Sequence, residues 1–323
     1  MTIRAKVAAT PATQPTTLKR EEERSGAGPL SLFGKFLSKF SVHVILILII
    51  VAWSVPTFAL LVSSFREPAD IARSGWWNAL TGSWSFTLDN YDQVLSQRNM
   101  GRAFMNSLII SVPSTILSIL VAAMAAYAFA WMRFPGRNML FLLVVGMLVV
   151  PVQMTLIPVL RIYGDVTVDT QVPIIGGNLF GINSFPGMWV AHTAYGLPFA
   201  IFLLRNFFAA LPRDLFESAY LDGASEVQVF FKIVLPLSGP ALAALGIFQF
   251  LWIWNDLLIA LIYMGDPELA PMTLAIRNLV SSFGTQYQFL TAAAFISMAL
   301  PLLIFFALQR YFVQGVLAGS VKG

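Results

Sequence analysis

The chain has 323 residues, of which 57% are hydrophobic and only 11% are charged, whereas soluble domains are typically about 25% charged. This composition excludes an ordinary soluble globular protein. The absence of Cys excludes disulfides, thiolate metal sites and Cys nucleophiles within the chain. The formal net charge of +4 is informative only through where Lys and Arg fall along the sequence.

Residues 1–40 have the composition of a polar tail. The segment TPATQPTT is rich in Pro and Thr, and KREEERSGAG carries mixed charge. Neither segment contains enough apolar surface to order itself by burial. The first apolar run begins near Val42 and exceeds 20 residues, which is too late and too long for a secretory signal peptide. We therefore expect a disordered cytoplasmic tail, residues 1–40, followed by an uncleaved first span.

Six apolar runs divide residues 41–323, which we expect to form one transmembrane domain. A helix of about 20 residues crosses the hydrocarbon core of a bilayer, so each run predicts one span. Pro113, Pro198 and Pro301 lie inside runs, where neighbouring helices can compensate for the lost backbone hydrogen bonds. The sequence thus predicts an all-α integral membrane protein of six transmembrane helices, with spans at about 42–64, 103–131, 138–160, 186–210, 236–263 and 289–312.

The distribution of Lys and Arg predicts the orientation. Fourteen of the 20 fall in the tail, between spans two and three, between spans four and five, and at the C-terminus. The other six are Arg66, Arg73, Arg98, Arg102, Arg161 and Arg277. Because cytoplasmic segments of membrane proteins are enriched in Lys and Arg, we expect both termini in the cytoplasm of a bacterium and the chain in its inner membrane, in contact with lipid.

Two segments are expected on the outer side. Residues 66–102 contain Trp76, Trp77 and Trp84, and clustered tryptophans are most often interfacial anchors, with a docking surface as the alternative. Residues 161–185 are rich in Gly and Asn with short apolar patches. The length of this second segment suggests local structure.

The cytoplasmic loop 211–235 is a polar interruption between two apolar runs. Leu215, Phe216, Ala219 and Tyr220 are spaced to share one face of a short helix. Gly223 can end that helix in a left-handed conformation, after which a second short helix restarts. The pattern predicts a compact helix–turn–helix that projects from the membrane and contacts a partner.

The chain contains no catalytic or nucleotide-binding motif. Its nearest approach to a P-loop, around Gly34 and Lys35, has the wrong spacing and no Ser or Thr after the Lys. The two His residues lack metal-ligand partners at short spacing, and we interpret His192 as a packed, hydrogen-bonded residue rather than a proton relay. We therefore expect no enzyme activity, no metal and no cofactor in this chain, and no nucleic-acid partner.

Asp256 is the one acid well inside an expected span. An acid at that depth is costly and usually faces the interior of a bundle. Two readings remain open: a structural clasp with Asn255, or a contact to the transported solute. Trp252 shares a helix face with Asn255 or Asp256 whereas Trp254 points elsewhere, so the expected substrate-pathway residues are Asn255, Asp256 and Trp252.

The loop resembles the EAA loop of ABC-importer permeases, with a Glu, a small residue, a Gly, an Ile and a Leu-Pro at matching spacing, and with Ser218 in place of the usual Ala. The segments FLLRNFFAALPRDLFESAYLDGAS, WNDLLIALI and GVLAGSVKG are similar to binding-protein-dependent sugar importer permeases, specifically the shorter maltose-type subunit. The resemblance covers about residues 40–323 and assigns ATPase coupling to Glu217, Ser218, Ala219, Asp222, Gly223, Ile233, Leu235 and Pro236.

This resemblance implies a division of labour. Two related permeases would form the pathway, two ATP-binding subunits would supply ATP and Mg²⁺, and an extracytoplasmic sugar-binding protein would deliver the solute. The first helix of the loop would be the coupling helix, with Glu217 bonded to the ATPase, Ala219 permitting close approach and Gly223 making the turn. Closure of the ATPases would then drive alternating access.

The substrate implied is a mono- or oligosaccharide, with an α-glucoside or glucose favoured by the length of the 161–185 segment. The alternatives are a permease for another small polar solute, a stand-alone channel or secondary carrier, and a membrane-anchored assembly subunit. The missing intramembrane relays argue against a carrier.

Overall fold

The structure, a computed structural model, describes residues 29–82, 85–165, 181–282 and 287–320. Most of the expected tail, the centre of the 161–185 segment and the last three residues lie outside these ranges. In the described ranges the chain is helical apart from turns and one isolated bridge between Arg66 and Phe86. The all-α prediction is therefore confirmed for this part of the chain.

The first of two units ends at Ala59. Its described residues belong to α2, Pro29–Ser64, which has a continuous apolar segment at Phe40–Ser64. The helix begins inside the expected tail, because Leu30, Phe33 and Leu37 already recur at helical spacing ahead of the apolar run.

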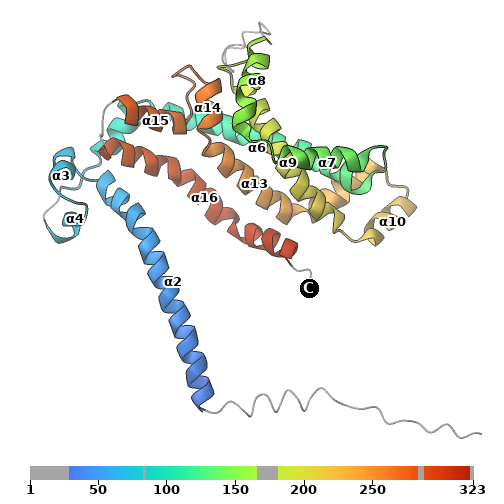
Figure 1. The fold of residues 1–323 in the computed structure, drawn as a ribbon, viewed down its shortest axis with the longest axis horizontal. Coiled ribbons are helices and arrows are strands. Elements are labelled where there is room, and N and C mark those ends of the chain that lie inside the picture. The colour runs from blue at the N-terminus through green and yellow to red at the C-terminus, as the bar shows by residue number, and fades with distance from the viewer. Residues whose placement is uncertain (1–28, 83–84, 166–180, 283–286, 321–323) are drawn as a thin grey trace, which may run out of the picture. The chain divides into compact units, whose positions relative to one another are not determined.

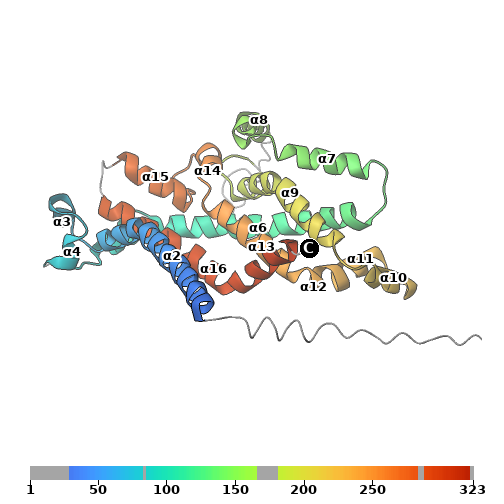
Figure 2. The same ribbon diagram turned by 60° about the horizontal axis from the view of Figure 1, so that its bottom comes forward.

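The second unit runs from Leu60 to the C-terminus. Its long helices are α6 (Met100–Trp131), α9 (Phe185–Ala209), α13 (Gly239–Trp254) and α16 (Tyr287–Ser320). Helix α6 packs along α9 and α13, and α13 packs along α16 (Figures 1 and 2). Pro113, Pro198 and Pro301 lie inside these helices, as the sequence predicts.

Short helices connect these long ones. Those before α6 are α3 (Pro68–Arg73), α4 (Asn78–Thr81), α5 (Asp89–Asp92) and the π-helical turn η1 (Gln93–Gln97). Between α6 and α9 are α7 (Arg137–Met147) and α8 (Val152–Asp165). Those that follow α9 are α10 (Arg213–Leu221), α11 (Glu226–Val229), η2 (Phe230–Val234), α12 (Leu235–Leu237), α14 (Leu258–Tyr263) and α15 (Met272–Ser282).

Within the described residues, four helices are long and apolar enough to cross a membrane, or up to six segments if each of two bent pairs forms one span. One bent pair is α7 and α8, which meet at 103°. Pro151 lies at this break, where it lacks an N–H and disfavours helical backbone at Val150. The span expected at 138–160 is therefore formed by two helices with a sharp bend between them.

The expected fifth span, 236–263, is also broken. It bends by 76° at Ser238, between the segment Glu226–Leu237 and α13, and it is interrupted again at residues 255–257, between α13 and α14. Asp256 thus lies at a helix break and not within a continuous helix. At a helix break, the Asp256 carboxylate can accept hydrogen bonds from backbone N–H groups that have no helical partner.

Candidate functional site

The α10–α11 hairpin, here residues 213–231 with the start of η2, has well-formed caps on both sides of its turn at Gly223. The N–H of Ala224 donates to the carbonyl of Ala219 at 2.9 Å, and that of Gly223 donates to Tyr220 at 3.1 Å. These two bonds form a Schellman motif. Gly223 has φ of +79°, which confirms the left-handed conformation predicted for it.

A capping box starts the second helix of the hairpin. The Ser225 hydroxyl accepts the N–H of Gln228, and the Gln228 side chain accepts the N–H of Ser225 at 2.9 Å. The box satisfies two backbone donors that would otherwise have no helical partner. Both helices of the hairpin are therefore defined by local hydrogen bonds.

One face of α10 anchors the hairpin to the rest of the unit. Phe216 is buried and stacks on Trp131 with ring centroids 3.6 Å apart, and Trp131 donates to the carbonyl of Phe208 at 2.9 Å. Ala219 is also buried in this core, so the close approach that it permits is to the chain's own helices. Leu215 and Tyr220, predicted on the same face, remain exposed.

The opposite surface of the hairpin is open. Glu217, Ser218 and Asp222 are exposed, and so are the apolar side chains of Leu221 (89% exposed), Val227 (64%) and Phe231 (59%). Of the other residues assigned to coupling, Ile233 and Leu235 pack against the core and Pro236 is exposed. Sequence analysis missed Leu221, Val227 and Phe231, although an apolar residue amid acids on a short polar helix signals a contact surface.

Glu226 ties the hairpin to α6. Its carboxylate accepts hydrogen bonds from the hydroxyls of Tyr127, on α6, and Tyr220, on α10, the latter at 3.0 Å. Burial, with the neighbouring Glu226 carboxylate, raises the pKa of Tyr220, so its phenol stays protonated as a donor. Glu226 therefore joins α6, α10 and α11 at one point.

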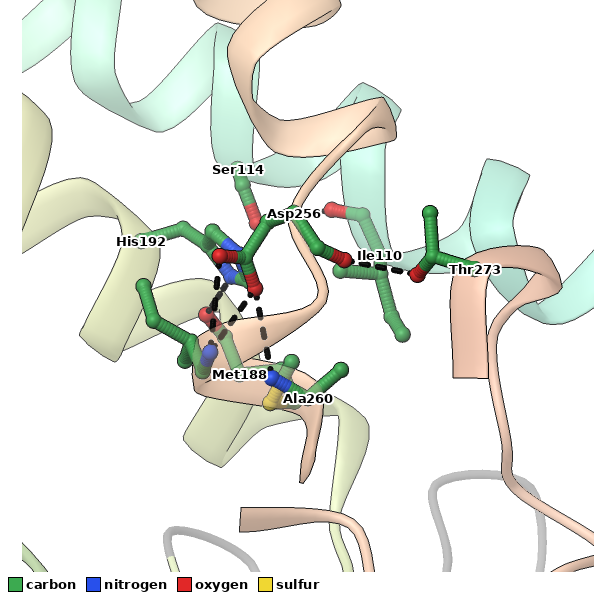
Figure 3. Close-up of polar contacts among 8 residues, drawn as sticks. Ile110, Ser114, Met188, His192, Asp256, Ala260 and Thr273 are labelled. Carbon is green, nitrogen blue, oxygen red and sulfur yellow. Dashed lines mark hydrogen bonds and ion pairs between the residues drawn. The ribbon is translucent and has the colours of Figure 1, made fainter. Parts of the chain in front are cut away.

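Asp256 lies at the break between α13 and α14 (Figure 3). Its carboxylate accepts the N–H groups of Ile259 at 3.1 Å and Ala260 at 3.2 Å, in the first turn of α14. The carboxylate therefore replaces helical carbonyls that the break removes. Thr273 secures the same point, because its hydroxyl donates to the Asp256 carbonyl at 2.6 Å.

The Asp256 carboxylate also faces His192 of α9, with Nε2 and Oδ2 3.4 Å apart. Nδ1 of His192 lies 3.0 Å from the carbonyl of Met188, which agrees with the predicted packed histidine. The two side chains are 1% and 11% exposed, and the cavity that they line measures only about 10 Å³. Asp256 therefore has a structural role, as one of the two interpretations expected. Its partners are backbone N–H groups of α14 and His192, and not the expected Asn255.

Asn255 and Trp252 are more exposed than this pair. The Asn255 amide is exposed and donates to the carbonyl of Leu251 on its own helix. Trp252 is 38% exposed, with its ring centroid 5.9 Å from that of His192. Trp254 is buried and donates to the carbonyl of Ser297, so the prediction that it points away from Trp252 holds.

Trp252 lines a cavity of about 330 Å³, which we call the Gln249 cavity. Its walls come from the α7–α8 break, from α9 and from α13, and include Tyr195, Phe199 and Gln249. Gln249 is 3% exposed, and its amide nitrogen has no hydrogen-bond partner among the residues that the structure describes. Buried polar groups are almost always paired, so this amide is a free donor at the wall of the cavity.

Gly196 makes room for Gln249. A Cβ added at Gly196 would collide with the amide nitrogen of Gln249, so Gly lets this side chain lie against α9 in its present position. Gln249 is not among the residues predicted from the sequence, although a Gln inside an apolar run can indicate a polar group that lines a cavity. Among the described residues, no cluster of three His, Asp or Glu is placed to hold a metal ion.

The sequence of this chain matches a known protein family. The family described as binding-protein-dependent transport system inner membrane component matches residues 104–318. The osmoprotective compounds uptake permease protein GgtD of Synechocystis is 50% identical, over 89% of this chain and 94% of its own length. The alpha-glucoside transport system permease protein AglG of Rhizobium meliloti is 40% identical, over 88% and 97%.

A solved structure shares the fold. It is a bacterial ABC transporter involved in the import of the acidic polysaccharide alginate, with a TM-score of 0.70 at 17% identity, covering 86% of this chain and 98% of the matched one. At that identity the match concerns the fold.

Proposed function

The chain belongs to the family of binding-protein-dependent transport inner membrane components, the permease subunits of ABC importers, and on this premise we propose that it carries a small neutral glucoside into the cytoplasm. The observation that supports this most is the α10–α11 hairpin. It is capped at both helices, anchored to α6 and exposed on the opposite surface.

The hairpin is built to receive force from an ATPase. A rigid element can transmit rigid-body motion, and the Schellman motif, the capping box and the Phe216–Trp131 stack make this one rigid. Leu221, Val227 and Phe231 supply the apolar contacts, and Glu217 and Ser218 supply the polar rim. Such an arrangement, apolar anchors within a polar rim, is typical of protein interfaces.

The Gln249 cavity provides the solute contact in this subunit. A carboxamide donor binds a sugar hydroxyl, and the exposed ring of Trp252 packs against the apolar face of a pyranose. The cavity lies at the α7–α8 break, where irregular backbone in a membrane is tolerated because it lines an aqueous space. Asp256 and His192 support this wall from behind by fixing the α13–α14 break against α9.

The names of the relatives support the substrate class. GgtD is named for osmoprotective compounds and AglG for alpha-glucosides, and both match this chain over most of their length. An uncharged α-glucosidic compound fits both descriptions. It also fits a cavity whose polar side chains are one amide, one phenol and one indole, without a charged side chain among the lining residues.

Two ATP-binding subunits, a second permease and a sugar-binding protein complete the proposed assembly, with the hairpin and both termini in the cytoplasm. A stand-alone proton-coupled carrier is the alternative, and the His192–Asp256 pair is the one feature that favours it. That pair lines a cavity of about 10 Å³, room for one water molecule at most and not for a chain of waters. Its carboxylate is already committed to two backbone N–H groups.

Uptake by the reconstituted complex tests the proposal. We expect ATP hydrolysis in proteoliposomes to rise when the binding protein is loaded with an α-glucoside, and radiolabelled solute to enter only with ATP. Uptake by this chain alone, driven by a pH gradient, would establish the carrier instead. Failure of any ATPase subunit to co-purify with the chain would also overturn the importer assignment.

A pair of variants tests the Gln249 cavity within the same assay. Gln249→Ala removes one hydrogen bond, worth about 0.5–1.5 kcal/mol, so we expect the apparent KM for uptake to rise by about two- to tenfold. Asn255→Ala serves as the control, since its amide is exposed and bonded to its own helix. The reverse result would restore Asn255 as the solute contact.

A further inference from the structure

A second, larger cavity lies beside the α10–α11 hairpin. Its volume is about 830 Å³, and we call it the arginine cavity. Four arginines from four places in the chain line it: Arg133 after α6, Arg137 at the start of α7, Arg205 on α9 and Arg213 on α10. The two acids at its wall are Glu217 and Glu226, and Glu226 is already bonded to two tyrosines.

Four arginines against two glutamates leave this cavity with a formal charge of +2. None of the four arginines forms an ion pair in the described part of the chain, since the carboxylate pairs within 4 Å involve Arg102 and His192. Nε of Arg205 is buried without a hydrogen-bond partner, and the same guanidinium lies 4.8 Å from the Phe141 ring centroid. Arg137 and Arg205 are partly buried and Arg133 and Arg213 are exposed. Several guanidinium groups that face one cavity without a carboxylate partner are suited to bind an anion.

We propose that the arginine cavity binds the phosphate of an anionic membrane phospholipid. Guanidinium groups match phosphate geometry with paired hydrogen bonds. Basic pockets between transmembrane helices on the cytoplasmic side are suited to lipid head groups. The inference rests on the proposed function for its orientation, which places the hairpin side at the cytoplasmic leaflet.

The apolar surface next to the cavity favours a lipid over a soluble phosphate compound. Arg133 and Arg137 also line an adjoining hollow of about 440 Å³, together with Phe134 and Met139. Beyond it, α7 exposes Met139, Leu142 and Leu143, at 62%, 64% and 53%. A head group held by the arginines would therefore place its acyl chains along an exposed apolar helix, whereas a free phosphate would leave that surface unused.

This position gives the lipid a regulatory role. Arg205 and Arg213 belong to the helices that enter and form the hairpin, while Arg133 and Arg137 belong to the connection between α6 and α7. A phosphate between them joins the hairpin to the membrane surface. Anionic lipid should therefore stabilise the hairpin in the position that receives the ATPase.

Lipid retention by the purified full complex tests the inference. The complex is placed in nanodiscs of phosphatidylcholine with or without about 30% phosphatidylglycerol, a fraction that raises the local attraction for basic residues, and bound lipid is counted by native mass spectrometry. We compare the native chain with Arg133→Gln/Arg137→Gln, with Arg133→Lys/Arg137→Lys, and with Arg277→Gln, an exposed arginine on α15.

We expect the native complex and Arg277→Gln to retain phosphatidylglycerol equally. Each arginine replaced by Gln should weaken retention about fivefold, and the Lys variant should lie between because it keeps the charge but loses paired hydrogen bonds. Equal retention by the Gln variant would overturn the site. If inorganic phosphate in phosphatidylcholine nanodiscs raises thermal stability as much as phosphatidylglycerol does, the ligand is a soluble phosphate and the lipid assignment fails.

The ATPase is the remaining competitor for these arginines. If the Gln variant retains lipid normally but loses its ATPase subunits, the cavity is a protein contact and the inference is wrong. Solute-stimulated ATP hydrolysis by the native complex is measured separately. The two measurements are independent. Loss of lipid binding would overturn the lipid site but not the importer assignment, and loss of ATP hydrolysis would not affect the count of bound lipid.

Discussion

Gly223 is the residue on which the turn of the α10–α11 hairpin depends. No atom lies within 4 Å of a Cβ built at this position, so a larger side chain meets no steric obstacle in the turn. The constraint is the φ of +79°, which costs most residues about 1–2 kcal/mol and costs Asn less. Backbone conformation, and not space, selects Gly here.

We therefore expect Gly223→Val and Gly223→Asn to differ. The Val variant should insert into the membrane normally but lose ATPase binding or uncouple hydrolysis from uptake, because its turn is strained. The Asn variant should retain most of both activities. Uptake and ATP hydrolysis in proteoliposomes measure the difference, and normal uptake by the Val variant would contradict the role of the turn.

Asp256 is the second residue whose role the structure changes. Asp256→Ala leaves the N–H groups of Ile259 and Ala260 and one face of His192 without a partner, which should lower stability by about 1–3 kcal/mol. Asp256→Asn keeps one acceptor oxygen and should lie between. Thermal unfolding of the purified complex measures the loss. An Ala variant of native stability that no longer transports would make Asp256 a solute contact instead.

At the scale of elements, the hairpin and the long helices follow from the sequence and the breaks do not. The first short helix of the 211–235 loop, the stop at Gly223 and the prolines inside α6, α9 and α16 are local features, set by periodicity and capping. The break at residues 255–257 depends on which partners Asp256 finds, and these come from α14 and from α9. An apolar run in the sequence predicts a span, but it does not show which residues of other helices will contact an acid within that run.

The same limit explains which site residues sequence analysis missed. The position of the Gln249 side chain against α9 depends on Gly196, which lies 53 positions earlier in the chain. Glu226 lies in the expected loop, but its tie to Tyr127 crosses from α11 to α6. Each contact joins residues far apart in the chain, whereas spacing arguments reach only along one helix.

The Glu226 tie should carry force between the hairpin and α6. Tyr127→Phe and Glu226→Gln each remove hydrogen bonds to a carboxylate, worth about 1.5–3 kcal/mol, so each should raise ATP hydrolysis that is not accompanied by uptake. Because both changes break one contact, the double variant should be little worse than either alone. Tyr163→Phe is the control, since it removes a tyrosine hydroxyl that donates to the carbonyl of Gly187, away from this tie. Additive effects would mean that the two residues act separately.

For the whole molecule, the absence of Cys makes each introduced cysteine a reporter of its own position. Leu221 on α10 is 89% exposed and Leu80 on α4 is 60% exposed. The charge distribution predicts that Leu221 lies on the cytoplasmic side and Leu80, in the 66–102 segment, on the outer side. Substitution at either exposed position should cost little stability.

A membrane-impermeant maleimide added to intact cells should therefore label Leu80→Cys, and label Leu221→Cys only after the membrane is opened. In opened membranes the ATPase subunits should protect Leu221→Cys and leave Leu80→Cys reactive, because an interface excludes the reagent only where it covers the side chain. Labelling of Leu221→Cys from outside would invert the orientation. If the ATPase leaves the labelling of Leu221→Cys unchanged, the α10–α11 hairpin is not the ATPase docking surface. That result would not alter the predicted orientation.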